Sequence, residues 1–63
     1  MLDNLNTFLK ETPGSLLQIE RLTDRPHTLD CVRCDVIFNE RIVVRGFGND
    51  ITAAMLDAQS KLI

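Results

Sequence analysis

Two cysteines in the middle of the chain are the residues best suited to chemistry. Cys31 and Cys34 are separated by two residues, a spacing that suits a metal or a redox pair on a helix or a knuckle. Residues 29–38 instead predict a strand, on which side chains three apart point to opposite faces. Zinc also needs about four ligands, and His27 is the only further candidate. We therefore expect no metal and no cofactor, with Cys34 in the core and Cys31 on the surface.

No other catalytic arrangement can be built from these residues. His27 is the single histidine of the chain, so neither a Ser-His-Asp nor a Cys-His arrangement can be argued from it. It has two readings, a contact to a phosphate or base and an ordinary loop residue. The carboxylates are spread evenly and form no obvious acid/base pair. We do not expect an enzyme.

A glycine run precedes the last helix of the chain. Gly46 and Gly48 flank Phe47, and such turns often hold a phosphate. A dinucleotide fingerprint needs a parallel βαβ unit, whereas the strands here are predicted to form hairpins. Residues 50–56 also contain no Lys or Arg. We expect the glycines to supply a strand exit at positive φ.

The composition indicates one small intracellular domain. The chain has 63 residues, of which 44% are hydrophobic, and a net charge of −2. A protein that grips a nucleic-acid backbone usually has a basic surplus, although a local basic stripe remains compatible with this balance. No stretch has the length of a membrane span, no signal peptide is seen, and two cysteines do not make a disulfide scaffold. We expect a cytoplasmic or nuclear domain cut from a longer protein.

The first part of the chain predicts a helix followed by a strand. Residues 2–11 carry apolar side chains at helical spacing; these are Leu2, Leu5, Phe8 and Leu9. Asp3 or Asn4 is expected to cap this helix, and Gly14, after a proline, to end it. Residues 15–22 alternate and predict a strand, with a short helix as the alternative because Leu, Gln and Glu favour helices.

The middle of the chain predicts a β-hairpin. Residues 29–38 place alternate apolar side chains on one face, and residues 41–48 form the return strand. We expect a three-residue loop, Asn39 to Arg41, because that loop puts four apolar side chains on the buried face. It pairs Phe38 with Ile42 and Val36 with Val44.

The last helix is predicted to begin near Asn49 or Asp50, both good caps. Its apolar stripe follows steps of three and four, at Ile51, Ala54, Met55, Ala58 and Leu62. The alanines allow close approach to a sheet. The predicted fold class is α+β in the order α-β-β-β-α, with a three-stranded antiparallel sheet and both helices packed on one face.

This pattern resembles the double-stranded RNA-binding domain over residues 1–63, nearly the whole chain. That family ends a strand with a G-x-G-x-G run, followed by Ser, two Lys and an Ala-rich helix with a further Lys. Gly46 and Gly48 match two of the glycines, and the loop that carries Pro26 and His27 matches the loop between the first two strands. Other matching positions are Val32, Cys34, Val36, Phe38, Ala54, Ala58, Leu62 and Ile63.

The chain departs from the family at its phosphate-binding lysines. The matching positions are Ile51, Thr52 and Met55, which carry no charge. Duplex affinity scales with the number of phosphate contacts, so the resemblance implies weak or absent binding to double-stranded RNA. The alternative function is weak binding through the loop and the first helix. Its contact residues would be Lys10, Arg25, His27 and Lys61.

The resemblance also implies a partner. Members that lose the lysines often bind proteins or themselves in RNA-processing, silencing and editing proteins. The sheet face without helices is expected to show apolar residues flanked by charged ones, including Asp35. The expected interface comprises Cys31, Arg33, Ile37, Arg41, Val43 and Arg45. We expect homodimerisation by edge pairing of residues 41–45, or docking of a partner protein.

Overall fold

The computed structural model describes residues 2–24 and 30–62. Two helices flank three strands in the chain: α1 is Asp3–Glu11, β1 is Leu16–Arg21, β2 is Val32–Phe38, β3 is Arg41–Gly48 and α2 is Ile51–Ser60. The order α-β-β-β-α and the α+β class are as predicted. Residues 16–21 form a strand, so the helical alternative for that segment is wrong.

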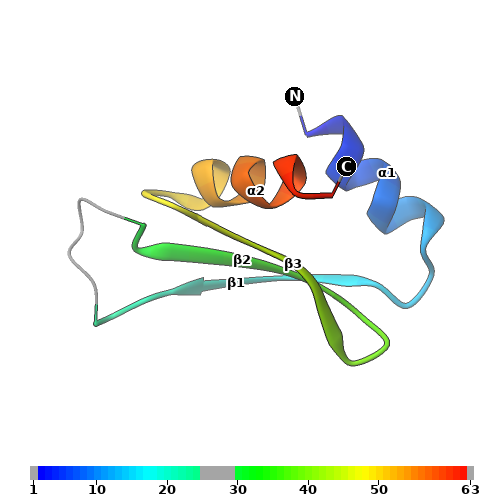
Figure 1. The fold of residues 1–63 in the computed structure, drawn as a ribbon, viewed down its shortest axis with the longest axis horizontal. Coiled ribbons are helices and arrows are strands. Elements are labelled where there is room, and N and C mark those ends of the chain that lie inside the picture. The colour runs from blue at the N-terminus through cyan, green and yellow to red at the C-terminus, as the bar shows by residue number, and fades with distance from the viewer. Residues whose placement is uncertain (1, 25–29, 63) are drawn as a thin grey trace.

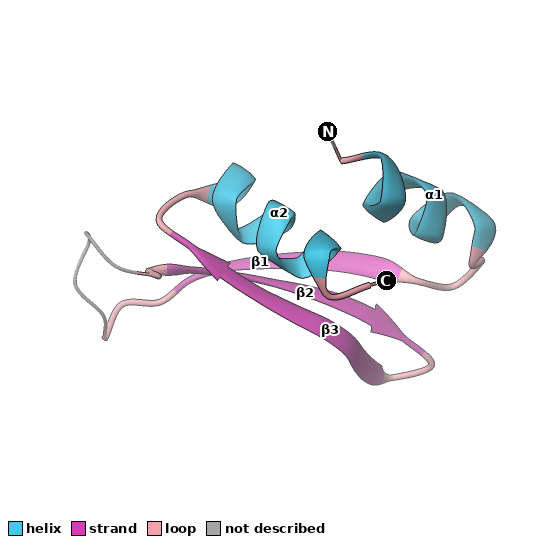
Figure 2. Ribbon diagram, turned by 45° about the horizontal axis from the view of Figure 1, so that its top comes forward, coloured by secondary structure: helices cyan, strands magenta, loops and turns pink. Residues whose placement is uncertain are grey.

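The sheet is antiparallel, with β2 between two edge strands, β1 and β3. Both helices lie on the same side of the sheet (Figures 1 and 2). Helix α2 packs along β3 and β2, and α1 packs beside α2. Within residues 2–24 and 30–62 no helix covers the opposite face of the sheet, because both helices pack on the face where the strands are most apolar.

Small residues set the distance between α2 and the sheet. Ala54 and Ala58 are fully buried against β3. A Cβ at Gly46 would overlap the backbone of α2 and lie 2.7 Å from the Ala58 Cα, and a Cβ at Gly48 would lie 2.5 Å from the Ala54 nitrogen. Both glycines lie within extended β3. Our prediction of a positive φ there is wrong, because the glycines serve close approach instead.

The two helix starts differ in which side chain accepts their backbone N–H groups. Asp50 caps α2 as predicted, since its Oδ1 accepts a hydrogen bond from the Ala53 N–H at 2.7 Å. The N-cap of α1 is Leu2, which has no side-chain cap, so the prediction of Asp3 or Asn4 is wrong. Gln59 of α2 replaces that cap, because its Oε1 accepts from the Leu5 N–H at 3.0 Å. The two helices are thereby joined by a polar contact as well as by packing.

The β2–β3 hairpin has a two-residue turn. Asn39 and Glu40 have φ values of 59° and 65°, and Phe38 pairs with Arg41. The predicted three-residue loop and the pair of Phe38 with Ile42 are therefore wrong.

A β-bulge then corrects the register of the hairpin. The extra residue, Val43, lies between the pair of Ile37 with Ile42 and the pair of Val36 with Val44. The predicted pair of Val36 with Val44 is confirmed, because the bulge restores the pattern that the short turn shifts. Phe38 and Ile42 are exposed rather than buried.

Candidate interaction surfaces

An apolar row crosses the uncovered face of the sheet. The strand register places Leu16 beside Ile37, and Ile37 beside Ile42. Leu16 and Ile42 are 50% and 49% exposed, and Ile37 is half-buried. We call these three residues the apolar row. One residue of each strand contributes, so the row exists only when the sheet has formed.

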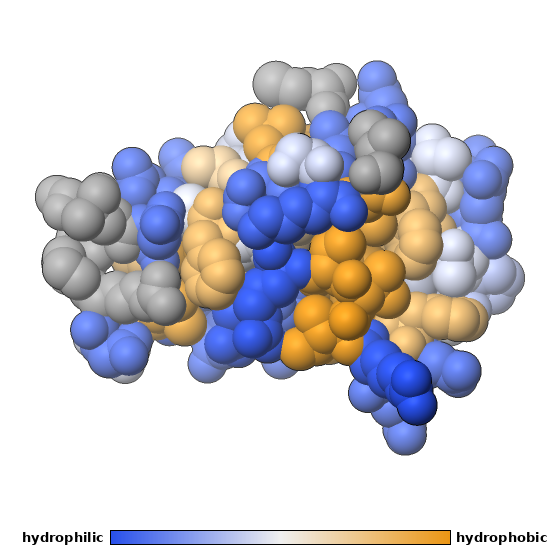
Figure 3. All heavy atoms as spheres, viewed as in Figure 1, coloured by the Kyte–Doolittle hydropathy of each residue, from blue (hydrophilic) through white to orange (hydrophobic). Residues whose placement is uncertain are grey.

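The bulge adds a second apolar feature at the end of this row. Val43 is 43% exposed, and residues 38–43 line a shallow hollow of about 690 Å³. The hairpin tip curls away from the helices there (Figure 1), as bulges increase local twist. In the space-filling view, apolar side chains gather over the half of β3 nearest the hairpin, next to hydrophilic ones (Figure 3). The predicted exposure of Val43 is confirmed.

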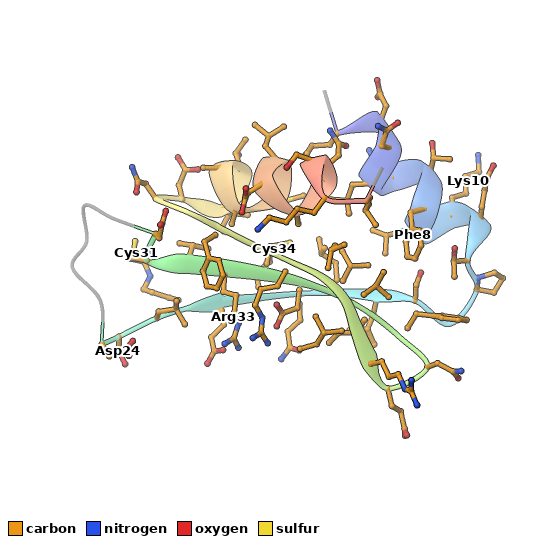
Figure 4. The ribbon with its side chains drawn as sticks, viewed as in Figure 1. Phe8, Lys10, Asp24, Cys31, Arg33 and Cys34 are labelled. Carbon is orange, nitrogen blue, oxygen red and sulfur yellow. The ribbon has the colours of Figure 1, made fainter. Side chains whose placement is uncertain are left out.

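A charged cluster follows the apolar row on the same face. Asp35 is only 3% exposed, and its Oδ1 accepts from the Arg45 Nε at 2.8 Å. The Arg33 Nε lies 3.3 Å from the Asp35 Oδ2, and the guanidinium of Arg33 also pairs with Glu20. Arg33 extends to the side of the sheet opposite the helices (Figure 4). The hydrogen bond that Arg45 donates to Asp35 raises the pKa of Arg45. Both arginines thus pair with side chains of the sheet itself.

Cys31 does not belong to this face. Its side chain is 2% exposed and contributes to the core, with Sγ 3.4 Å from the Asn49 carbonyl oxygen. The prediction of a surface position is wrong, because Cys31 precedes β2, and the alternation of a strand does not extend to it.

Both cysteines are buried thiols that form no disulfide, and Figure 4 labels their positions. Burial, and then the charge of Asp35, raises the pKa of Cys34. Within residues 2–24 and 30–62 no group of three or more His, Cys, Asp and Glu side chains is placed to hold a metal ion.

The start of α2 offers no cation to a phosphate. Ile51 is 54% exposed, Thr52 is exposed and Met55 is half-buried. Ile51 was predicted to belong to the apolar stripe of this helix, but its side chain is exposed instead of facing the sheet. The backbone N–H of Ala53 is one of the groups that could bind an anion at this helix end. It donates instead to the Asp50 carboxylate. The Asp50 carboxylate thus lies at the helix start where a phosphate would bind, and its charge would repel one.

Two of the four candidate RNA-contact residues, Lys10 and Lys61, lie among the described residues. Lys10 is exposed in the last turn of α1, and it lies at the opposite end of the domain from Asp24 (Figure 4). Lys61 follows α2, and its ammonium group donates to Asp57 and to the Arg45 carbonyl oxygen. Arg25, Pro26 and His27 lie outside the described residues.

One polar arrangement was missed at the sequence level. On the free edge of β3, the Asp57 Oδ2 accepts from the Phe47 N–H at 2.9 Å, and the Lys61 Nζ donates to the Arg45 carbonyl oxygen at 3.0 Å. The two side chains also pair with each other at 3.0 Å. The hydrogen bond from Phe47, and then Lys61, lower the pKa of Asp57. The sequence signal was the four-residue spacing of opposite charges, Asp57 in α2 and Lys61 at its C-cap.

Comparison of the chain with protein-family models, with curated proteins and with solved structures found no match. Among the residues that the structure describes, no helix has the length and apolar character needed to cross a membrane.

Proposed function

We propose that this domain is a protein-interaction module that forms a homodimer through the uncovered face of its sheet. The observation that carries the proposal is the apolar row, which crosses all three strands, with Leu16 and Ile42 exposed on either side of the half-buried Ile37. Contiguous exposed apolar side chains rimmed by charge are typical of interaction sites. Under the resemblance to the double-stranded RNA-binding domain, the parent protein would act in RNA processing, silencing or editing.

A second copy is the occupant that the apolar row favours. Two copies that meet by this face bury the row of one against the row of the other about a two-fold axis, the commonest symmetry of soluble oligomers. Arg45 lies beside the row on the same face, where it pairs with the buried Asp35. Arg41 pairs with Phe38 and therefore points to the helix side of the sheet.

Edge pairing of residues 41–45, the alternative route to a homodimer, is less compatible with the described geometry. The bulge at Val43 interrupts the regular edge, and bulges blunt edges against pairing. The Arg45 carbonyl oxygen already accepts from Lys61. These two features favour the face over the edge.

Loss of duplex binding is the other half of the proposal. The helix start that would hold phosphates presents Ile51, Thr52 and the Asp50 carboxylate. Each missing phosphate contact removes part of the salt-dependent affinity. We expect no measurable binding of a short RNA duplex, even in low salt.

Light scattering over a range of chain concentrations tests the homodimer. The wild type is expected to have twice the monomer mass, and Ile42→Asp and Leu16→Asp are expected to be monomers, because a charge in the row must be desolvated on association. Ile51→Asp is the matched control, since Ile51 is as exposed as Ile42 but lies on α2. A wild type that stays monomeric at every concentration overturns the homodimer.

Titration with a short RNA duplex tests the second half. Binding that weakens steeply with salt, and that Arg25→Ala reduces, would replace the proposal with weak duplex recognition through the loop at Arg25 to His27. Thr52→Lys combined with Met55→Lys is the positive control, because it returns two cations to the helix start.

A further inference from the structure

Strand β3 has a free edge, because among the described residues it pairs with β2 alone. Arg45 and Phe47 are two residues apart and therefore direct their peptide groups to the same side of the strand. The Arg45 carbonyl oxygen and the Phe47 N–H both contact side chains of the α2 segment, so that side is the free edge. Free edges of this kind are templates for strand addition.

Asp57 and Lys61 supply the groups that a neighbouring strand would supply. In a parallel pair, one residue donates its N–H to the carbonyl of one residue of the next strand, and accepts at its own carbonyl from the N–H two residues further on. Here the Lys61 ammonium donates to the Arg45 carbonyl at 3.0 Å, and the Asp57 carboxylate accepts from the Phe47 N–H at 2.9 Å. The 3.0 Å contact between the two side chains joins donor to acceptor.

We propose that the Asp57–Lys61 pair is a strand mimic that closes the edge of β3 and so directs self-association to the face of the sheet. The pair covers the regular half of the strand, and the bulge at Val43 interrupts the other half. Without the pair, Arg45 and Phe47 offer an acceptor and a donor in the register that β3 of a second copy, running parallel, can use.

The glycine run explains how the helix reaches the edge. Gly46 lies between the two capped peptide groups, and a Cβ there would overlap the α2 backbone at Ala54 and Ala58. Only with a glycine at this position does α2 lie close enough for side chains one helical turn apart, at 57 and 61, to reach past β3 to its outer edge. The glycines therefore set the helix position from which Asp57 and Lys61 reach the edge of β3. In other proteins a glycine run of this kind binds a phosphate.

The inference rests on the proposed homodimer for its consequence, but the edge is tested separately. We would replace both capping residues, as Asp57→Ala with Lys61→Ala, in the wild type and in the Ile42→Asp background. The second background removes the apolar row, so any association there must use another surface. Asp24→Ala with Lys10→Ala is the matched control, because it makes the same change of charge at exposed positions away from β3.

Two readouts are needed, light-scattering mass and amide hydrogen exchange at Phe47. In the Ile42→Asp background at low concentration, the capping variant should exchange the Phe47 amide at least about tenfold faster than its parent. At higher concentration it should form dimers or larger species, and the control variant should stay monomeric. If the double replacement does not fold by circular dichroism, Lys61→Met keeps the apolar stem of the side chain and is tested in the same way.

Two results would overturn the inference. The first is an unchanged exchange rate at Phe47, which would mean that the pair does not cap the edge. The second is faster exchange with a mass that stays monomeric at all concentrations, which would mean that the capped edge does not control association. A wild type that is itself monomeric would overturn the homodimer alone, since association of the capping variant would still be measured against its own background.

Discussion

Gly46 lies against the backbone of Ala58, so close that a Cβ at position 46 would overlap the Ala58 nitrogen and lie 2.7 Å from its Cα. This contact brings helix α2 onto the edge strand of the sheet. It also places the capping residues Asp57 and Lys61 beside β3. A glycine that resembles part of a phosphate-binding turn is therefore a packing residue in this domain.

Gly46→Ala is expected to lower the free energy of unfolding by about 3 kcal/mol, because the backbone of α2 must move away from β3. For a domain of this size that is a large share of the total stability. Denaturant unfolding measures the change. Thr52→Ala, on the exposed side of α2, is the control and should change stability by less than about 0.5 kcal/mol. Equal stability of Gly46→Ala and the wild type would contradict the contact.

Gln59→Ala is expected to cost about 1 kcal/mol, since it leaves the Leu5 N–H at the start of α1 without its acceptor. The Leu5 amide should also exchange its hydrogen faster. Gln59→Glu keeps a carbonyl-type oxygen at the same place and should remain near the wild type. If both variants lose the same stability, the hydrogen bond is not the cause.

Glu40→Gly is expected to stabilise the domain by about 1 kcal/mol, because Glu40 has a φ of 65°, where a side chain is strained and glycine is not. Asn39 also has a positive φ, but asparagine tolerates it, so Asn39→Gly should gain less. Both are best measured by denaturation in the Ile42→Asp background, which keeps association out of the comparison. A loss of stability in Glu40→Gly would contradict the two-residue turn.

The stability of the domain is expected to fall in acid partly through Asp57. Its pKa in the folded protein is lowered, first by the hydrogen bond from Phe47 and then by Lys61. A carboxyl whose folded pKa lies below the unfolded value of about 3.9 stabilises the fold above that value. The contribution is lost as the pH drops through the folded pKa.

Urea unfolding of the wild type and of Asp57→Asn, from about pH 6 to about pH 2, measures this contribution. The wild type should be more stable at the upper end, and the difference should shrink toward the lower end. A difference that stays constant over the whole range would mean that the carboxylate charge has no part in it.

Both thiols are expected to react slowly in the folded protein. Cys34 is fully buried with a raised pKa, and Cys31 is buried with its Sγ against the Asn49 carbonyl. A thiol reagent at mildly alkaline pH should label the folded chain at least about 100-fold more slowly than the urea-unfolded chain. Cys31→Ser and Cys34→Ser assign the rate to each position. Rapid labelling of either thiol would show that the site opens locally.

The sequence by itself determined the element order, the Asp50 cap and the contribution of Ala54 and Ala58 to the core. Each of these depends on local spacing, at a period of two or 3.6 residues, or on the chemistry of one capping side chain. The pair of Val36 with Val44 was also predictable, because burial selects the register.

Only the tertiary structure decided the placement of Cys31, the bulge at Val43 and the capping of the β3 edge by Asp57 and Lys61. A bulge adds one residue wherever the twist of the hairpin favours it, and no local pattern marks that position. The glycines at 46 and 48 and the capping pair at 57 and 61 lie in different elements, and they act together only because α2 folds back onto β3. Contacts of that kind follow from the relative position of two elements, which no single segment of the sequence encodes.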